Sequence, residues 1–271
     1  MNGSNRIPRL ARVAFAIGVI GLGTLGVVYG DFASGWPAWV PWRRALLYAA
    51  AAVMLLGGAG LLFARTASIS IRVLLPYLLL WMLLRIPALA MAPQVEVNWF
   101  AVGETAVLVA AAWLLWADLC AARDGSIARF GGGERGRYVA RMLFGLSLVA
   151  FGLSHFFYLR QTVVLVPSWL PFHSGWAYLT GAGHIAAGIG VLLSIYPQWA
   201  AGMEAAMLTI FTLVVWIPAV IVAPTVRDNW SELVISWAIT AGAWVVAGSI
   251  ATVRPDSPRA RAGSTSHTPP C

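Results

Sequence analysis

Long apolar runs, separated by short polar stretches, occupy most of this chain. They lie at residues 11–31, 44–64, 71–92, 100–120, 139–159, 174–195, 200–222 and 233–253. Each is about 20 residues long, which is the length of helix that crosses a hydrocarbon layer of about 30 Å. Inside a bilayer the backbone has no water to bond with, so each run must be helical. The pattern predicts an all-α polytopic membrane protein with eight transmembrane helices.

The second half of this pattern repeats the first. Pro37–Pro41, which reads PAWVP, matches Pro167–Pro171, which reads PSWLP, at an offset of 130 in residue number. Further on, Ile86–Trp99 matches Ile217–Trp230, and the offset there is 131. A unit with an even number of helices starts on the same side of the membrane each time it occurs. We therefore expect two tandem four-helix bundles related by a pseudo-two-fold axis along the membrane normal.

The repeat divides the chain into five segments, two of which are membrane units. We expect a cytoplasmic N-terminus at 1–10, a first four-helix unit at 11–120, a basic cytoplasmic linker at 121–138, a second four-helix unit at 139–253 and a disordered cytoplasmic tail at 254–271. The basic start imitates a signal peptide. Its apolar run has a partner in the second half, however, and is interpreted as the first span.

Composition supports the assignment as a membrane protein, and the distribution of charge predicts how the chain is oriented in the membrane. Hydrophobic residues make up 60% of the chain and charged residues 10%, whereas a soluble domain carries about a quarter charged residues. With the N-terminus inside, 13 arginines flank the predicted cytoplasmic side and four flank the other side. This bias predicts a multi-pass protein of the bacterial inner membrane with both termini cytoplasmic. The net charge of +8 is thereby explained without nucleic acid, and the lipid bilayer is the expected partner.

Three stretches of the second unit carry a family resemblance. They read FGLSHFFY at 151–158, VPSWLP at 166–171 and WAYLTGAGHIAAG at 176–188. A four-helix unit with a Pro-Trp outer loop and a glycine-rich second helix resembles the DoxX-like membrane proteins. Members are commonly one such unit, so this chain resembles two in tandem. The resemblance implies a redox-linked system, because one branch is similar to the membrane subunit of a thiosulfate:quinone oxidoreductase. It implies no catalytic residue, since the family has no agreed catalytic set.

Two histidines lie inside predicted spans of the second unit. Helical spacing places His184 on one stripe with Gly181 and Gly188. It places His155, near the outer end of the preceding span, on a stripe with Gly152. Small residues let helices approach closely in a membrane, so both stripes should face protein rather than lipid.

We expect His155 and His184 to share one cavity with Tyr158 or Tyr178 at its mouth. Counted along the helices, the two histidines differ in depth by about 10 Å. That distance is too large for one metal ion, so no metal site is predicted. It suits a larger ligand such as a quinone, or a proton path. The alternative is that His184 is a neutral residue bonded to a neighbouring helix.

Arg85 and Glu104 form a second candidate pair, in the third and fourth spans. They lie about 12 Å and 8 Å deep by helical rise. An unpaired buried charge is costly, so we expect them to pair. A structural ion pair that holds two helices together is favoured over a substrate site.

Three functions remain open. The sequence contains no P-loop, HExxH, GxSxG or haem CxxCH motif, which disfavours an enzyme acting alone. The leading hypothesis is a subunit or accessory protein of a redox-linked system, with quinone as the candidate cofactor and a redox protein or a second copy as candidate partners. A small-solute transporter built from tandem repeats is one alternative. The other is a structural scaffold whose Trp-Pro loops dock a soluble partner.

Overall fold

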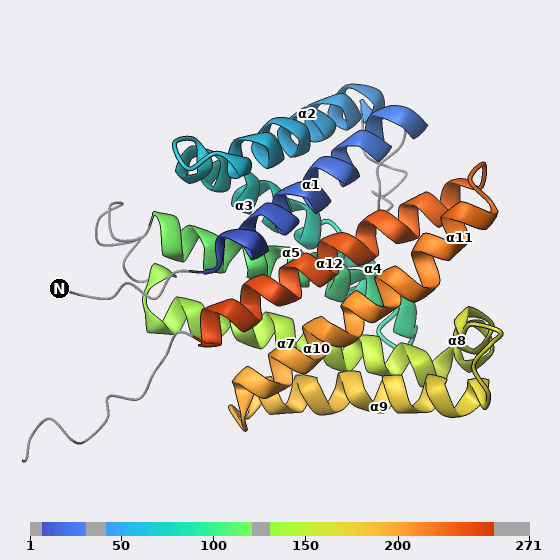
Figure 1. Cartoon of the computed structure of the whole chain (residues 1–271). Helices are drawn as coiled ribbons and strands as arrows, with labels where there is room; N and C mark the ends of the chain where they lie inside the picture. The colour runs from blue at the N-terminus through green and yellow to red at the C-terminus, as the bar shows by residue number, and fades with distance from the viewer. Residues whose placement is uncertain (1–6, 31–41, 121–130, 252–271) are drawn as a thin grey trace, which may run out of the picture.

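A computed structural model of the chain describes residues 7–30, 42–120 and 131–251. Every secondary-structure element in these ranges is helical (Figure 1). In chain order they are α1 (Arg9–Tyr29), α2 (Arg43–Leu62), α3 (Ala67–Leu83), α4 (Ile86–Met91), α5 (Glu96–Leu119), α7 (Glu134–Phe157), α8 (Leu159–Leu165), α9 (His173–Leu192), α10 (Pro197–Phe211), the π-helical turn η1 (Thr212–Trp216), α11 (Ile217–Val222) and α12 (Arg227–Ala251). The predictions for Pro37–Pro41, for most of the linker and for the tail fall outside the described residues.

Seven helical segments of the described chain are long and apolar enough to cross a membrane: α1, α2, α3 with α4, α5, α7, α10 through α11, and α12. The predicted span at 174–195 forms α9, which is 20 residues long but is not among the seven. Its sequence holds two histidines and five glycines among 20 residues. Large apolar side chains such as Leu56, Val164 and Ile221 stay exposed, as a lipid-facing surface requires. The chain is therefore an all-helical, polytopic membrane protein.

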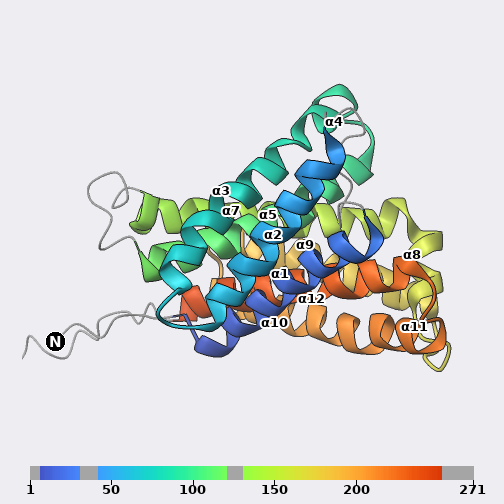
Figure 2. The ribbon, with the colours of Figure 1, turned by 90° about the horizontal axis from the view of Figure 1, so that it is seen from above.

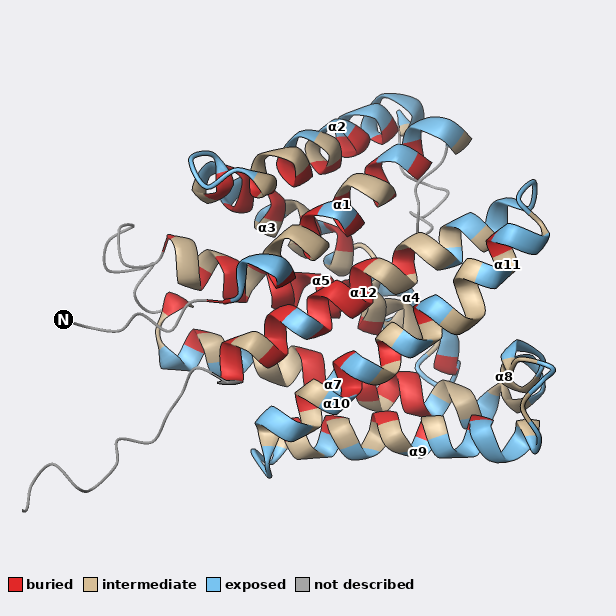
Figure 3. Ribbon diagram, in the orientation of Figure 1, coloured by how far each residue is buried: buried red, intermediate tan, exposed pale blue. Residues whose placement is uncertain are grey.

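Neighbouring helices pack in a closed series, and two of its members, α5 and α12, also meet in the centre. Within the first half α1 packs on α2, α2 on α3 and α3 on α5; within the second, α7 packs on α9, α9 on α10 and α10 on α12. The halves meet where α5 packs on α7 and where α12 packs on α1. Between them α5 and α12 pack on each other and are the most buried helices (Figure 3).

The two ends of the bundle differ. The short helices α4, α8 and α11 lie away from the N-terminus (Figures 1 and 2), and we name this the distal end. The N-terminal end is where α1 begins and α12 ends (Figure 1). Both histidines of interest lie on helices that run between these ends. The helix α8 was not predicted, because it lies in the stretch interpreted as a loop.

A π-helical turn explains why the repeat offset changes from 130 to 131. The first residues of α3 and α10, Ala67 and Pro197, are separated by the offset of 130. The first residues of α4 and α11, Ile86 and Ile217, are separated by the offset of 131. The second half therefore holds one additional residue between these points. The turn Thr212–Trp216 accommodates it, since a π-helical turn takes up an inserted residue without breaking the helix.

The two halves also share a hydrogen-bond pattern at the distal end. The side-chain amide of Asn98 donates to the carbonyl oxygens of Ala88 and Ala92, at 3.2 and 3.0 Å. The amide of Asn229, its equivalent in the second half, donates to the two equivalent carbonyls at 3.0 and 3.2 Å. Each of these carbonyls also accepts a backbone N–H bond, so the asparagine amide adds a second hydrogen bond at the end of the preceding short helix.

Candidate functional site

Glycines bring α7 and α9 into backbone contact. A Cβ atom added at Gly188 would lie 2.7 Å from the carbonyl oxygen of Gly145, closer than real Cβ atoms approach. One added at Gly181 would lie 3.2 Å from the carbonyl oxygen of Gly152. The predicted stripes therefore do face protein, and His184 on the α9 stripe is buried. Close packing of these backbones decides where both histidines lie.

A buried carboxylate meets His184 from the neighbouring helix. Glu204 of α10 places Oε1 2.7 Å from Nδ1 of His184. The two side chains are 3% and 0% exposed. A contact this short joins a carboxylate or carboxylic acid to an imidazole through one shared hydrogen. The second carboxyl oxygen of Glu204, Oε2, is buried without a hydrogen-bond partner. The two groups thus share one hydrogen, and Oε2 is left as a further hydrogen-bond acceptor.

His155 lies directly beside this pair. Its Nδ1 is 2.8 Å from the carbonyl oxygen of Phe151. A carbonyl oxygen only accepts, so Nδ1 must carry the hydrogen, and Nε2 of the neutral ring is left as an acceptor. The ring centroids of His155 and His184 are 5.0 Å apart. Two imidazoles and one carboxyl group therefore form a single polar cluster, which we call the histidine cluster: His155, His184 and Glu204.

Aromatic rings enclose the histidine cluster. The ring of Phe211, the last residue of α10, lies 6.5 Å from that of His155 and 5.9 Å from that of His184. The ring of Phe151 lies 6.2 Å from that of His184 and 5.2 Å from that of Phe100 on α5. These walls keep the cluster in apolar surroundings. No group of three or more His, Cys, Asp or Glu side chains in the described ranges is arranged to hold a metal ion.

The depth difference expected between the histidines, about two turns, is wrong. A Cβ atom at Gly181 would lie 2.7 Å from Cβ of His155, so the two positions are level. His184 is three residues further on, which is about one turn of helix. The expectation assumed that α7 and α9 end at the same height. In the structure α9 extends past the end of α7 and packs beside α8 there.

The two tyrosines do not gather at the cluster. The hydroxyl oxygen of Tyr158 accepts a hydrogen bond from the backbone N–H of Val97, at 3.3 Å. It thereby ties the end of α7 to the first turn of α5, whose N–H groups lack helical partners. The ring of Tyr178 is 48% exposed and packs against Phe156 at 5.8 Å. The structure thus brings together His155 and His184 and leaves Tyr158 and Tyr178 apart from them.

Arg85 and Glu104 lie within electrostatic range of each other. Nε of Arg85 is buried without a hydrogen-bond partner, so the structure shows two interacting charges and no hydrogen bond from that nitrogen. Glu232 of α12 also interacts with Glu104. These three charged side chains come from α5, α12 and the break between α3 and α4. They lie where the two halves meet, well separated in the chain from the histidine cluster.

A hydroxyl group secures the π-helical turn beside the histidine cluster. Thr212, which follows Phe211, donates to the carbonyl oxygen of Leu208 at 3.0 Å. Its oxygen lies 2.7 Å from the hydroxyl of Ser236 and 3.1 Å from that of Thr240, both on α12. One donor and two acceptors complete the capacity of a hydroxyl group. The turn is therefore held against α12, which fixes the position of Phe211.

Glu204 was not among the residues predicted from the sequence. The available signal was a single acidic residue in the apolar stretch PQWAAGMEAAMLTIF, because an ionisable group inside a span marks a functional candidate. The first half shows the contrast. In the repeat alignment Met54 is the equivalent of His184 and Leu74 is that of Glu204, and both are buried in the apolar core. Equivalent positions are thus apolar in one half and a polar pair in the other.

One protein-family model matches part of the chain. It is described as a domain of unknown function (DUF8561), and it matches residues 144–247. The matched segment includes all three members of the histidine cluster, so the chain is similar to that family over the half that carries the site. No curated protein and no solved structure matches the chain.

Proposed function

We propose that this chain is a membrane subunit or accessory protein of a redox-linked system, and that its second half binds a quinone headgroup at the histidine cluster. The observation that carries the proposal is the contact of two histidine rings, 5.0 Å apart, with a buried carboxyl group 2.7 Å from one of them. Reduction of a quinone takes up protons at its two oxygens. A cluster that holds and releases protons inside an apolar wall suits that chemistry.

The members of the histidine cluster differ in burial, and we assign them different roles on that basis. His155 is half-buried, and its neighbours Leu153, Phe156 and Phe157 are 38%, 38% and 66% exposed on the lipid-facing side. A lipid-soluble ligand could thus approach His155 laterally, and Nε2 of the neutral ring would accept a hydrogen bond from a quinol hydroxyl group. His184 and Glu204 lie behind it and would hold the proton. In quinone reduction the two electrons would come from the redox partner, and in quinol oxidation they would pass to it while two protons are released.

The proposal includes the architecture expected from the repeat. Four observations support two tandem units related by a pseudo-two-fold axis along the membrane normal: the equivalent packing of α5 on α7 and α12 on α1, the central contact of α5 with α12, the matched helix starts, and the matched asparagine bonds. In this arrangement α9 is an eighth span and both termini share the cytoplasmic side. The likeness to DoxX-like proteins belongs to the same proposal.

Quinone binding by the purified protein is the direct test. We expect a short-chain ubiquinone or menaquinone analogue to bind the protein in nanodiscs, and the affinity to fall at least tenfold in His155→Ala and His184→Met. His173→Ala is the matched control, because His173 is the first residue of α9 and lies outside the cluster. If the analogues do not bind, or bind all three variants equally, the quinone proposal is wrong.

Small-solute transport is the second candidate, and a specific observation favours it. Arg85, Glu104 and Glu232 interact where the two halves meet. Transporters built from tandem repeats bind their substrates between the repeats. Transport predicts a substrate flux in proteoliposomes that Glu104→Gln abolishes and that His155→Ala leaves intact. The opposite dependence would support the histidine cluster instead.

A further inference from the structure

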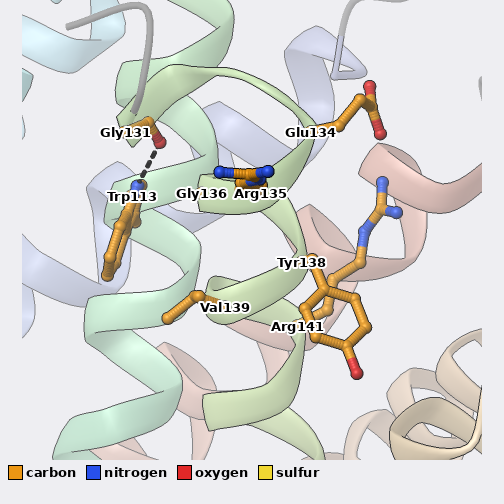
Figure 4. Close-up of a pocket in the computed structure, with 8 residues that line it drawn as sticks. All are labelled: Trp113, Gly131, Glu134, Arg135, Gly136, Tyr138, Val139 and Arg141. Atoms are coloured by element: carbon orange, nitrogen blue, oxygen red, sulfur yellow. Dashed lines mark hydrogen bonds between the residues drawn. The ribbon is translucent and has the colours of Figure 1, made fainter. Parts of the chain in front are cut away.

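A hollow of about 650 Å³ opens at the N-terminal end of the bundle, where α7 begins. Its walls combine apolar and cationic side chains, which Figure 4 shows together. Trp113 of α5 and Val139 and Tyr138 of α7 form the apolar part. Arg135 and Arg141 supply the guanidinium groups. None of these residues belongs to the histidine cluster or to the charges between the halves.

The charged groups lie nearer the end of the bundle than Tyr138 and Val139 (Figure 4). Figure 4 shows the Arg141 side chain reaching back along α7 toward Glu134, while Tyr138 and Val139 lie deeper. A long cationic side chain inside a span extends in this way to place its charge at the membrane surface. The hollow thus has the polarity profile of a lipid, with charge at the surface and an apolar wall below it.

The guanidinium of Arg141 has more N–H donors than its hydrogen bond to α12 uses. Its Nη2 donates to the carbonyl oxygen of Ser249 at 2.8 Å, which ties α7 to α12. Its Nε is buried without a hydrogen-bond partner. A guanidinium has five N–H donors in a planar fork that matches the oxygens of a phosphate. The same group that braces the helices therefore retains the capacity to bind an anion.

The local charge favours an anion as well. Arg135, Arg137 and Arg141 stand against Glu134 in the first turns of α7, so three positive charges and one negative charge leave a formal charge of +2. Glu134 is exposed and interacts electrostatically with Arg141. It lowers the positive potential without cancelling it. Basic hollows between transmembrane helices near the membrane surface bind anionic lipid headgroups.

We propose that this hollow binds the phosphate of an anionic phospholipid, with Arg135 and Arg141 on the headgroup and Trp113, Tyr138 and Val139 along the upper acyl chains. A free phosphate would make no use of the apolar wall, which is why the observations favour a lipid. The site would link α5, α7 and α12 where they converge. It does not depend on the function proposed for the histidine cluster.

Thermal stability of the detergent-purified protein tests the site. We expect phosphatidylglycerol to raise the Tm by several degrees, because a ligand that binds only the folded state stabilises it. Phosphatidylcholine with the same acyl chains should have a much smaller effect. Arg135→Gln should weaken the apparent affinity for phosphatidylglycerol at least tenfold. Arg160→Gln is the control, since Arg160 is exposed on α8 at the distal end.

Arg141→Gln is a second variant, in which the Tm without lipid should also fall because the bond to Ser249 is lost. Native mass spectrometry should then show fewer phosphatidylglycerol molecules retained by both arginine variants than by Arg160→Gln. Equal stabilisation by the two lipids would overturn the proposal. So would an unchanged lipid response in Arg135→Gln. Stabilisation by glycerol 3-phosphate alone, equal to that by the lipid, would show a phosphate site and also overturn it.

Discussion

At the scale of single residues, the second half differs from the first by replacing apolar side chains with a polar pair. Met54 and Leu74 are 4% and 0% exposed, and His184 and Glu204 stand at the equivalent positions of the second half. A buried pair of this kind seldom stabilises a protein more than apolar side chains of similar volume. Apolar residues at the equivalent positions are compatible with the fold, so packing alone does not require the polar pair.

The apolar pair of the first half predicts how a double variant of the second half behaves. His184→Met alone should leave Glu204 buried without its partner and lower the free energy of unfolding by about 1–3 kcal/mol, and Glu204→Leu should do the same to His184. The double variant reproduces the pair found in the first half, so it should recover most of that loss. Thermal unfolding in detergent measures all three. Additive losses in the double variant would contradict the prediction, and His173→Met should change little.

At the scale of elements, the contact between α7 and α9 positions the histidine cluster. The Cα atoms of glycines on both helices allow backbone approach, and His155 lies level with Gly181 because of it. The π-helical turn acts on the other side, where Thr212 holds the end of α10 against α12 and so fixes Phe211. The close contact of α7 with α9 thus positions His155 and His184, and the π-helical turn positions Phe211.

Two glycine substitutions separate packing from helix propensity. Gly181→Ala should lower the free energy of unfolding by about 1–3 kcal/mol, because its new Cβ would lie 2.7 Å from that of His155 and the helices must move apart. Gly202→Ala on α10 meets no atom within 4 Å and should be neutral or stabilising by up to about 1 kcal/mol. Equal Tm values for the two variants would show that the α7–α9 contact is not close in the folded protein.

At the scale of the whole molecule, the chain closes on itself. Its first helix packs on its last, α1 on α12, as α5 packs on α7 in the middle of the chain. Because α5 and α12 also pack on each other, each half buries its own fourth helix against that of the other. Neither half therefore has a complete core by itself.

Closure can be tested with a disulfide between the first and last helices. A Cβ atom at Gly21 would lie 3.8 Å from Cβ of Val234, which is the usual separation in a disulfide. We expect Gly21→Cys with Val234→Cys, in a Cys271→Ser background, to cross-link under mild oxidation. Peptide mass spectrometry would identify the bond. Gly202→Cys with Val234→Cys is the control, and cross-linking in it but not in the first pair would contradict the arrangement.

The sequence alone predicted the helical segments, the matched stretches at offsets of 130 and 131, and the protein-facing stripes. Seven of the eight predicted spans are long and apolar enough to cross a membrane in the described chain. Apolar runs of this length have only one way to satisfy their backbone in a bilayer, and glycines at helical spacing mark a close contact whatever the partner. His184 could therefore be placed correctly on a buried stripe. The change of offset between the halves was also visible in the sequence, although its cause, the turn Thr212–Trp216, was not.

Only the tertiary structure decided which side chains meet. The depth of His155, the direction of Tyr158 and the roles of Asn98 and Asn229 all depend on how far one helix slides along another, and no single helix carries that information. The pairing of Glu204 with His184 likewise depends on the rotation of α10 about its axis against α9. Local sequence fixes the faces of a helix, whereas the axial offsets between helices arise from packing. The histidine cluster exists only because of those offsets.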